Sequence, residues 1–309
     1  MADVSDAATG ATSETGATAG AVDLGAAEQQ FSAARRRLFG IAYRILGSAA
    51  EADDVLQDAW VRWQTYDRST VRNPDAFLTT TTTRLAINVA QSARVRRETY
   101  IGPWLPEPVD TSADPTLGAE RGEALEVALL MLLEKLTPTE RAAYVLREAF
   151  DYPYEQIAEI IGHSQASVRQ LVSRARRHLG EGERRAPVAP EAQRRLLTAF
   201  VAAAKSGDVA VLESLFAQDV ISYSDGGGAV RASRFPVVGR PRVAKYHHAF
   251  AGHFWVGVEV EPVEVNGYPA MKLRRDGEFF AVLTVRATHD GIDRVLWMMN
   301  PQKLAALSA

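Results

Sequence analysis

Residues 154–179 read YEQIAEIIGHSQASVRQLVSRARRHL. This run contains two short segments whose apolar residues recur with the 3.6-residue period of an amphipathic helix. Gly162 lies between them, where a residue in the left-handed conformation can end the first helix. Ser164 follows, and its hydroxyl can cap the second helix by accepting a backbone N–H. The pattern predicts a helix-turn-helix in which both apolar stripes close on one small core.

The second segment is basic, and its outward residues combine amides, a hydroxyl and arginines. Such side chains read base edges or bind phosphates when a helix enters the major groove of DNA. The residues expected to contact DNA are Gln165, Arg169, Gln170, Ser173, Arg174, Arg176 and Arg177. A solvated charged face is the alternative for any lone basic helix. Here the preceding helix, the turn and the cap agree, which favours DNA contact.

The chain has 309 residues, enough for two or three domains that each bury a core. Its net charge is -3, but residues 1–27 carry acids and no Lys or Arg, so the net value hides basic patches. The absence of cysteine excludes disulfides and thiolate metal sites, and fits a reducing compartment. No stretch resembles a membrane span or a secretion signal, so we expect a cytoplasmic location without a membrane partner.

Composition also divides the chain. Residues 1–27 are expected to form a disordered tail, because Ala, Gly, Thr and Ser bury little apolar area. Residues 28–100 and 120–182 have helical periodicity, and the proline-rich residues 101–119 favour an extended linker between them. Residues 190–309 change to helices followed by period-two strands. The expected fold class is two all-α domains followed by an α+β domain.

Three short motifs accompany these domains: WLPEP at 104–108, DGGG at 225–228 and NPQKL at 300–304. The glycine triplet favours a tight strand turn, since it lacks the spacing of a phosphate-binding loop. With the domain order, these motifs resemble an extracytoplasmic-function (ECF) sigma factor that has a SnoaL-like C-terminal domain of cone-like α+β fold. Two positions depart from that family. Its glycine motif usually continues with Lys, where this chain has Ala229, and its terminal motif usually has an acid, where this chain has Gln302.

The resemblance implies that the chain binds core RNA polymerase and that it recognises and melts promoter DNA. It also implies that the chain is not an enzyme and needs no cofactor. An acidic surface of the first domain would bind the clamp helices of the largest polymerase subunit. Its candidate residues are Asp53, Asp54, Gln57, Asp58 and Trp60. A solvated acidic helix face is the alternative interpretation.

The resemblance also implies a segment that melts the minus-ten promoter element and holds a flipped base of the non-template strand. Hydroxyls and arginines suit the backbone of a single strand. The candidates are Asn73, Thr80, Arg84, Asn88, Arg94, Arg96 and Arg97, while the helix of residues 165–179 would read the duplex minus-35 element. Alternatively, the threonines of residues 79–83 pack within the domain.

In such a protein the fused tail domain takes the place of a separate anti-sigma factor. We expect the motifs of the tail to lie near the linker and to set the relative placement of the two promoter-reading domains. The residues expected to make these regulatory contacts are Trp104, Leu105, Pro106, Asp225, Gly226, Gly227, Gly228, Asn300, Pro301 and Lys303.

The tail domain itself leaves other functions open. SnoaL-like folds include enzymes, so an acid–base pair could come from Tyr223, Asp225, His247, His248, His253 or Trp255, although the histidine spacing fits no metal site. A small-molecule ligand could also occupy the cone. A repressor with a ligand-sensing tail and an enzyme fused to a DNA-binding module are the competing classes. Stable binding to core polymerase distinguishes the sigma factor from both.

Overall fold

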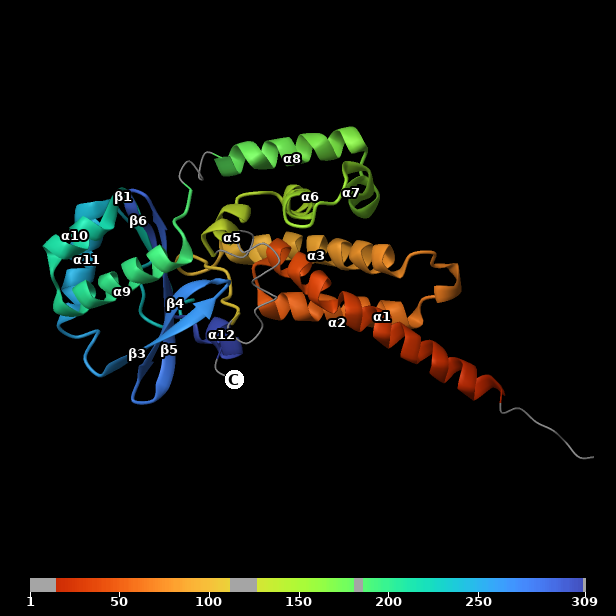
Figure 1. The fold of residues 1–309 in the computed structure, drawn as a ribbon, viewed down its shortest axis with the longest axis horizontal. Helices are drawn as coiled ribbons and strands as arrows, with labels where there is room; N and C mark the ends of the chain where they lie inside the picture. Colours follow the sequence, from red (N-terminus) through yellow and green to blue (C-terminus); the bar gives the residue numbers. More distant parts are fainter. Residues whose placement is uncertain (1–14, 112–126, 181–185, 308–309) are drawn as a thin grey trace, which may run out of the picture.

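The computed structural model describes residues 15–111, 127–180 and 186–307 (Figure 1). Three helices form the first unit: α1 (Thr15–Leu46), α2 (Ala49–Thr65) and α3 (Pro74–Glu98), with a 3₁₀ turn η1 (Arg68–Thr70) before α3. Side chains start two of these helices, because Ser48 caps α2 and Asn73 caps α3 by accepting backbone N–H groups of the first turn. The predicted helical domain is therefore three packed helices.

Part of the expected disordered tail is helical. α1 begins at Thr15, so residues 15–27 are helical, and residues 1–14 lie outside the described residues. Ala27 is buried, and its carbonyl accepts a hydrogen bond of 3.2 Å from the indole of Trp63. Composition missed this helix because alanine, although it buries little area, has the highest helix propensity.

The second unit contains α5 (Val127–Leu133), α6 (Pro138–Glu148), α7 (Tyr154–Ile161) and α8 (Gln165–Gly180). The turn between α7 and α8 is as predicted: Gly162 is left-handed with φ 72°, and Ser164 Oγ accepts from the N–H of Ser167 at 3.2 Å. The buried face of α8 supplies Val168, Leu171, Val172, Ala175 and Leu179.

The two helical units share one hydrophobic core rather than two. It extends from Ala27 through Leu78 and Leu146 to Leu179. The packing joins α3 to α6 and α7, so the helix-turn-helix lies directly on the helix that carries the expected minus-ten residues. In Figure 1, α6 and α7 lie between α3 and α8.

The tail is an α+β domain, as expected. Its elements are α9 (Pro190–Ser206), α10 (Val209–Leu215), β1 (Phe216–Asp225), β2 (Val237–Val238), α11 (Arg240–Ala251), β3 (Val258–Val265), β4 (Tyr268–Arg275), β5 (Glu278–Thr288), β6 (Gly291–Met298), α12 (Pro301–Leu304) and η3 (Ala305–Leu307). One mixed sheet has the order β2-β1-β6-β5-β4-β3, in which only β1 and β6 are parallel.

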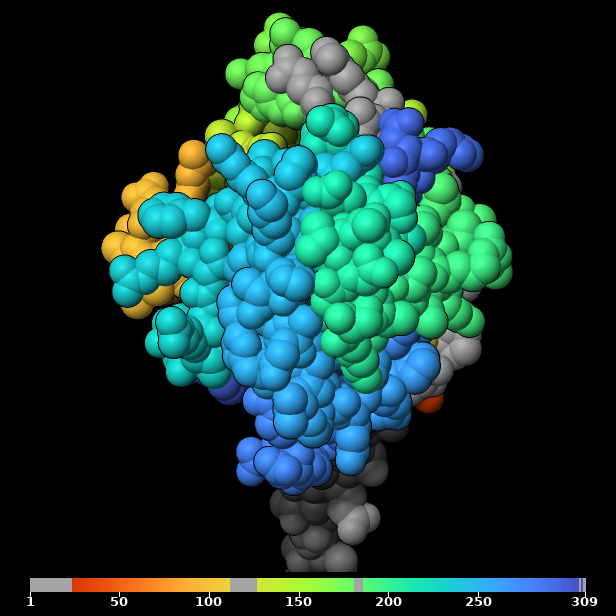
Figure 2. All heavy atoms as spheres, turned by 90° about the vertical axis from the view of Figure 1, so that its left-hand side faces the viewer, coloured from red at the N-terminus to blue at the C-terminus, as the bar shows by residue number. Residues whose placement is uncertain are grey.

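Each face of this sheet has its own apolar core. Helices α9, α10 and α11 pack on one face, which Figure 2 shows as the green and cyan side of the molecule. On the other face, Leu105 of the linker and Val127 of α5 join sheet residues and Leu304 of α12 in a second cluster. The linker therefore lies between the tail domain and the helical units. No helix of the described residues is long and apolar enough to cross a membrane.

Candidate functional site

The junction of the three parts is centred on Asp225, the last residue of β1, which is fully buried. One carboxylate oxygen, Oδ1, accepts from the Tyr100 hydroxyl at 2.5 Å and from the N–H of Gly227 at 3.1 Å. The other oxygen, Oδ2, accepts from the N–H of Leu105 at 2.8 Å. A single carboxylate thus joins the strand end, the end of the first helical unit and the linker.

Lys303 supplies the charge that balances this carboxylate. Its ammonium lies 2.7 Å from Asp225 Oδ2, donates to the carbonyl of Leu105, and is only 6% exposed as a residue. It also lies 4.2 Å from the ring centre of Trp104 and 4.9 Å from that of Tyr100. Burial lowers the pKa of Lys303, and the charge of Asp225 partly offsets this. Burial also raises the pKa of Tyr100, and the hydrogen bond to Asp225 raises it further.

Trp104 connects this junction to the first helical unit. The guanidinium of Arg97 lies 3.6 Å from the centre of the indole ring, on the side of α3. Gly47, with φ 66°, leaves room for the same indole, since a Cβ there would be 2.8 Å from it. Arg97 also donates to the carbonyl of Leu46 at 2.6 Å and forms an ion pair with Glu134 from the segment after α5.

A second set of contacts lies farther along the linker. The Glu107 carboxylate accepts from Ser48 Oγ at 2.8 Å, and its backbone carbonyl accepts from the Tyr43 hydroxyl at 2.6 Å. Asn266, in the β3–β4 turn, donates to the same hydroxyl at 2.6 Å and accepts from the N–H of Val109 at 3.0 Å. These bonds tie α1, the linker and the sheet together without a formal charge pair.

The structure brings together most of the residues expected to make regulatory contacts. Leu105 and Pro106 are buried, Asn300 caps α12 and donates to Tyr100 at 2.9 Å, and a Cβ on Gly227 would overlap the Asn300 side chain. Pro301 and Gly228 are exposed. Ala229 and Gln302, the two departures from the family pattern, are also exposed. They therefore leave the charges of the buried Asp225–Lys303 pair unchanged.

The outward face of α8 carries all seven residues expected on duplex DNA, and each is exposed. Arg174 lies 3.7 Å from Glu140, and Arg176 forms an ion pair of 2.7 Å with Glu148. The Arg169 guanidinium lies 5.6 Å from the Tyr154 ring centre. The helix-turn-helix geometry thus presents this face to solvent, and three of its arginines contact neighbouring side chains.

Three comparisons identify the family. The model for sigma-70 region 2 matches residues 31–98, and that for sigma-70 region 4 matches residues 126–179. The chain is 36% identical to the ECF RNA polymerase sigma factor SigJ of Mycobacterium tuberculosis, over 89% of this chain and 92% of SigJ. The protein belongs to the ECF RNA polymerase sigma factors. It is also 30% identical to a probable ECF sigma factor, SigI, of the same species, over 89% of this chain and 93% of SigI.

The tail domain is included in this likeness. The crystal structure of M. tuberculosis SigJ has a TM-score of 0.73 and 29% identity to this chain, and the match covers 90% of this chain and 98% of SigJ. This sigma factor therefore consists of region 2, region 4 and a C-terminal domain with a mixed sheet. Its family acts in transcription initiation.

In this sigma factor, α3 carries the residues expected at the minus-ten element. Asn73, Arg84, Asn88, Arg94 and Arg96 are exposed, and Thr80 is half-buried. A hollow of about 390 Å³ over α3 is lined by Arg62, Ala76, Phe77, Thr80, Thr81 and Arg84. The alternative interpretation of the threonine run applies to Thr79, Thr82 and Thr83, which are fully buried.

Arg84 also fixes the position of region 4. It donates to the carbonyl of Ile160 at 2.8 Å and to that of Glu159 at 3.0 Å, both in the last turn of α7. A guanidinium is favourable there because the final carbonyls of a helix lack intrahelical partners. Thr79 of α3 adds a contact of 3.3 Å to the Tyr152 hydroxyl. One of the residues expected to hold single-stranded DNA, Arg84, thus binds the helix-turn-helix in this structure.

The residues expected at the polymerase surface lie along one side of α2. Asp53, Asp54, Gln57 and Asp58 are exposed, and Asp53 forms an ion pair of 3.1 Å with Arg35. Trp60 is half-buried, and its ring centre lies 5.1 Å from that of Phe31. Polymerase binding by these residues stays a prediction.

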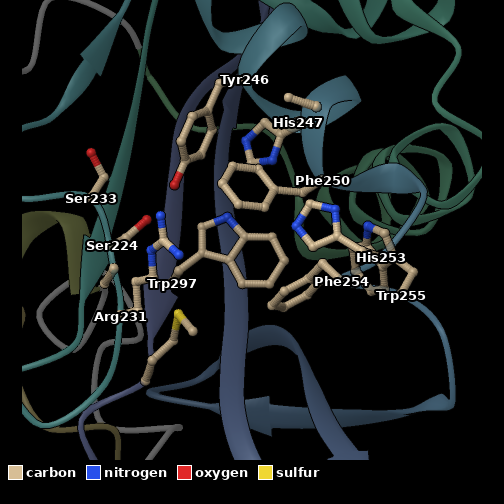
Figure 3. Close-up of a pocket in the computed structure, with 13 residues that line it drawn as sticks. Ser224, Arg231, Ser233, Tyr246, His247, Phe250, His253, Phe254, Trp255 and Trp297 are labelled. Atoms are coloured by element: carbon tan, nitrogen blue, oxygen red, sulfur yellow. The ribbon is translucent and has the colours of Figure 1, made fainter.

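The tail domain holds a cavity of about 640 Å³ between α11 and the sheet (Figure 3). Aromatic side chains dominate its lining, which consists of Ser224, Arg231, Ala232, Ser233, Tyr246, His247, Ala249, Phe250, His253, Phe254, Trp255, Trp297 and Met299. The cavity includes His247, His253 and Trp255 of the six candidate acid–base residues. Asp225 is instead committed to the junction, and His248 contacts the carbonyl of Gly207 at 2.7 Å.

No Asp or Glu lines this cavity, and the described residues contain no group of three or more His, Asp or Glu able to hold a metal ion. His247 is 4% exposed and lies 3.4 Å from Ser222 Oγ. Burial lowers its pKa to about 3. His247 is therefore neutral near pH 7, and no carboxylate lies among the lining residues to pair with it.

The depressed pKa of His247 predicts acid-sensitive folding of the tail domain. Between pH 6.5 and about 3, the unfolded chain binds a proton at this position and the folded chain does not. Stability should thus fall as the pH falls, by about 1.4 kcal/mol per pH unit at most, or about 2 kcal/mol between pH 6.5 and 5. Urea unfolding followed by tryptophan fluorescence measures this loss, which His247→Phe should reduce. An equal acid loss in both proteins would contradict the assignment.

Several junction residues were not predicted from the sequence. Tyr100, Asn266 and Glu134 contact the linker or its neighbours, yet none belongs to one of the three motifs. Glu107 lies within WLPEP but was not among the residues expected to make regulatory contacts. Asn266 gives one local signal, because it precedes Gly267 between two alternating strands, as in a two-residue hairpin turn. That signal predicts the turn but not its contact with Tyr43.

Proposed function

We propose that the tail domain restrains this sigma factor in cis by holding regions 2 and 4 in a closed arrangement. The observation that supports this most is the Asp225 carboxylate, which binds the linker N–H of Leu105, the Tyr100 hydroxyl and the Lys303 ammonium. The linker between regions 2 and 4 is thus attached to the tail at a fully buried point. Contacts made within one chain need little intrinsic affinity to compete with a separate partner.

Promoter geometry explains why a closed arrangement would be inactive. The names of the minus-ten and minus-35 elements place them about 25 base pairs apart, which is roughly 85 Å of duplex at about 3.4 Å per base pair. The two DNA-reading surfaces therefore have to separate to bind both elements at once. In the closed arrangement, Arg84 binds α7 and the two units share one core. Opening has to break these contacts and the linker attachment.

Once open, the chain would use three surfaces. The acidic face of α2 around Asp54 and Asp58 would bind the basic clamp helices of core polymerase. The α3 hollow would hold the minus-ten strand, and α8 would enter the major groove of the minus-35 element. The chain needs no anti-sigma factor for restraint in this proposal, because the tail occupies that role.

A distance measurement tests the restraint directly. The chain has no cysteine, so Gln91→Cys on α3 and His178→Cys on α8 introduce one dye pair at exposed positions. We expect high energy transfer in the free protein and low transfer after addition of core polymerase and promoter DNA. Trp104→Ala should lower transfer in the free protein, because the linker then loses its contacts with Arg97 and Lys303. Unchanged transfer on promoter binding would refute the closed arrangement.

Recognition by α8 gives a separate prediction. Arg169→Ala should weaken binding to a minus-35 duplex by about 1–3 kcal/mol and relax its sequence preference, because an early arginine reads bases. Arg177→Ala should weaken binding to all DNA sequences alike and reduce the slope of log K against log salt by about 1. Fluorescence anisotropy over a salt series measures both. Arg195→Ala, at an exposed position of α9, is the control and should change neither.

A further inference from the structure

The cavity of the tail domain contains a polar group that the protein leaves unused. Trp297 is 5% exposed, and its indole N–H has no hydrogen-bond partner among the described residues. A buried donor without a partner costs free energy, so such groups call for a ligand or water. Figure 3 draws the indole within the group of lining side chains, with Tyr246 and Arg231 beside it.

The walls of the cavity favour a flat apolar body. The ring centre of Trp297 lies 5.4 Å from that of Phe254 and 5.8 Å from that of Trp255, and Tyr246 and Phe250 line the opposite side on α11. These three rings pack against one another and form an aromatic wall, on which a planar ring system can stack. A volume of about 640 Å³ lies within the range of small-molecule sites, about 300–1,000 Å³.

The charges favour an anion. Arg231 is exposed at the cavity, and it makes no ion pair with another described residue. No carboxylate lines the cavity, so a cationic ligand would meet only Arg231 and neutral groups. The indole N–H is a donor only, and it therefore requires an acceptor on the ligand. The ligand class is a planar aromatic acid whose ring also carries an oxygen acceptor.

We propose that this cavity binds a hydroxy- or keto-substituted aromatic acid, with the rings among the aromatic side chains, the acceptor on Trp297 and the carboxylate on Arg231. Its occupation is transmitted to the linker junction, a second step that rests on the proposed restraint. Strand β1 provides the connection, because adjacent residues of a strand point to opposite faces. Ser224 lines the cavity, and the next residue, Asp225, binds the linker. Likewise Met299 lines the cavity and Asn300 binds Tyr100.

Isothermal titration of the full chain with 3-hydroxy-2-naphthoate tests binding, with its neutral primary amide as the matched compound. The acid should bind at least about tenfold more tightly than the amide, because a charged acceptor strengthens the bond to a guanidinium. Trp297→Phe keeps a ring and removes the donor, so it should weaken binding of the acid by about tenfold. Arg231→Gln should reduce the affinity for the acid to that for the amide. The control is Arg234→Gln, because Arg234 is exposed in the same loop and does not line the cavity; it should leave the affinity unchanged.

Binding of neither compound at millimolar concentration, or equal affinity for acid and amide, would overturn the proposed site. Equal losses in Arg231→Gln and Arg234→Gln would do the same. Transmission is measured with the α3–α8 dye pair: the acid should change energy transfer in the wild type and not in Asp225→Asn. Binding without any change in transfer would refute the transmission step. The restraint itself is tested by Asp225→Asn without any compound, so its failure is distinguishable from failure of the site.

Discussion

Asp225→Asn is expected to lower the stability of the closed arrangement by about 3–5 kcal/mol, because it leaves Lys303 as a buried charge without its counterion. The amide still fits the space of the carboxylate. It cannot neutralise the ammonium, and its nitrogen cannot accept from the Tyr100 hydroxyl or the Leu105 N–H. The measurements are the denaturant midpoint and the α3–α8 energy transfer of the free protein. Both should fall, and promoter-dependent transcription in vitro should rise.

The matched variants separate charge from shape. Lys303→Met removes the charge and keeps much of the side-chain length, so Asp225→Asn combined with Lys303→Met should recover a large part of the loss. The loss in Asp225→Asn should also shrink as the pH rises. Without Asp225, the folded-state pKa of Lys303 falls further below its unfolded value of 10.5. The unfolded chain then binds more protons, and stability rises with pH. Additive effects of the two substitutions would contradict a coupled pair.

Local patterns predicted the helix-turn-helix because its signals are local. Gly162 and Ser164 act within one turn of the helices that they end and begin, and the apolar period of α8 is complete. The mixed sheet is different. Alternation indicated strands such as β5, but the parallel pairing of β1 with β6 joins residues about seventy positions apart, which no local pattern encodes.

The sequence predicted which segments meet at the junction, but not the hydrogen bonds and ion pair that join them. The three motifs indicated which segments meet, and the structure places Asp225 beside Leu105 and Lys303. Tyr100 resembles an ordinary polar residue in the sequence, because its role depends on burial by distant segments. The same reason applies to the shared core of regions 2 and 4. Each amphipathic helix predicts that it is buried, but not which domain covers it.

The family resemblance assigns Arg97 to promoter DNA, whereas the structure holds its side chain inside the protein. Its side chain is 16% exposed, forms an ion pair with Glu134, binds the Leu46 carbonyl and lies on the Trp104 ring. Arg97→Ala is therefore expected to lower stability by about 2–3 kcal/mol, less than a fully broken buried pair, since Arg141 still binds Glu134. Arg97→Lys should give an intermediate loss, because an ammonium lacks the planar face that lies on the indole.

Arg94→Ala provides the matched comparison three positions earlier on the same helix. Arg94 is exposed, so its replacement should change stability by less than about 0.5 kcal/mol and should weaken binding to single-stranded minus-ten DNA. Urea unfolding and anisotropy with a labelled single strand separate the two effects for each variant. If Arg97→Ala left the unfolding midpoint unchanged and reduced strand binding as Arg94→Ala does, Arg97 would belong to the DNA surface. If it lowered the midpoint alone, the linker contact would be its role, and the minus-ten surface would consist of the exposed arginines of α3.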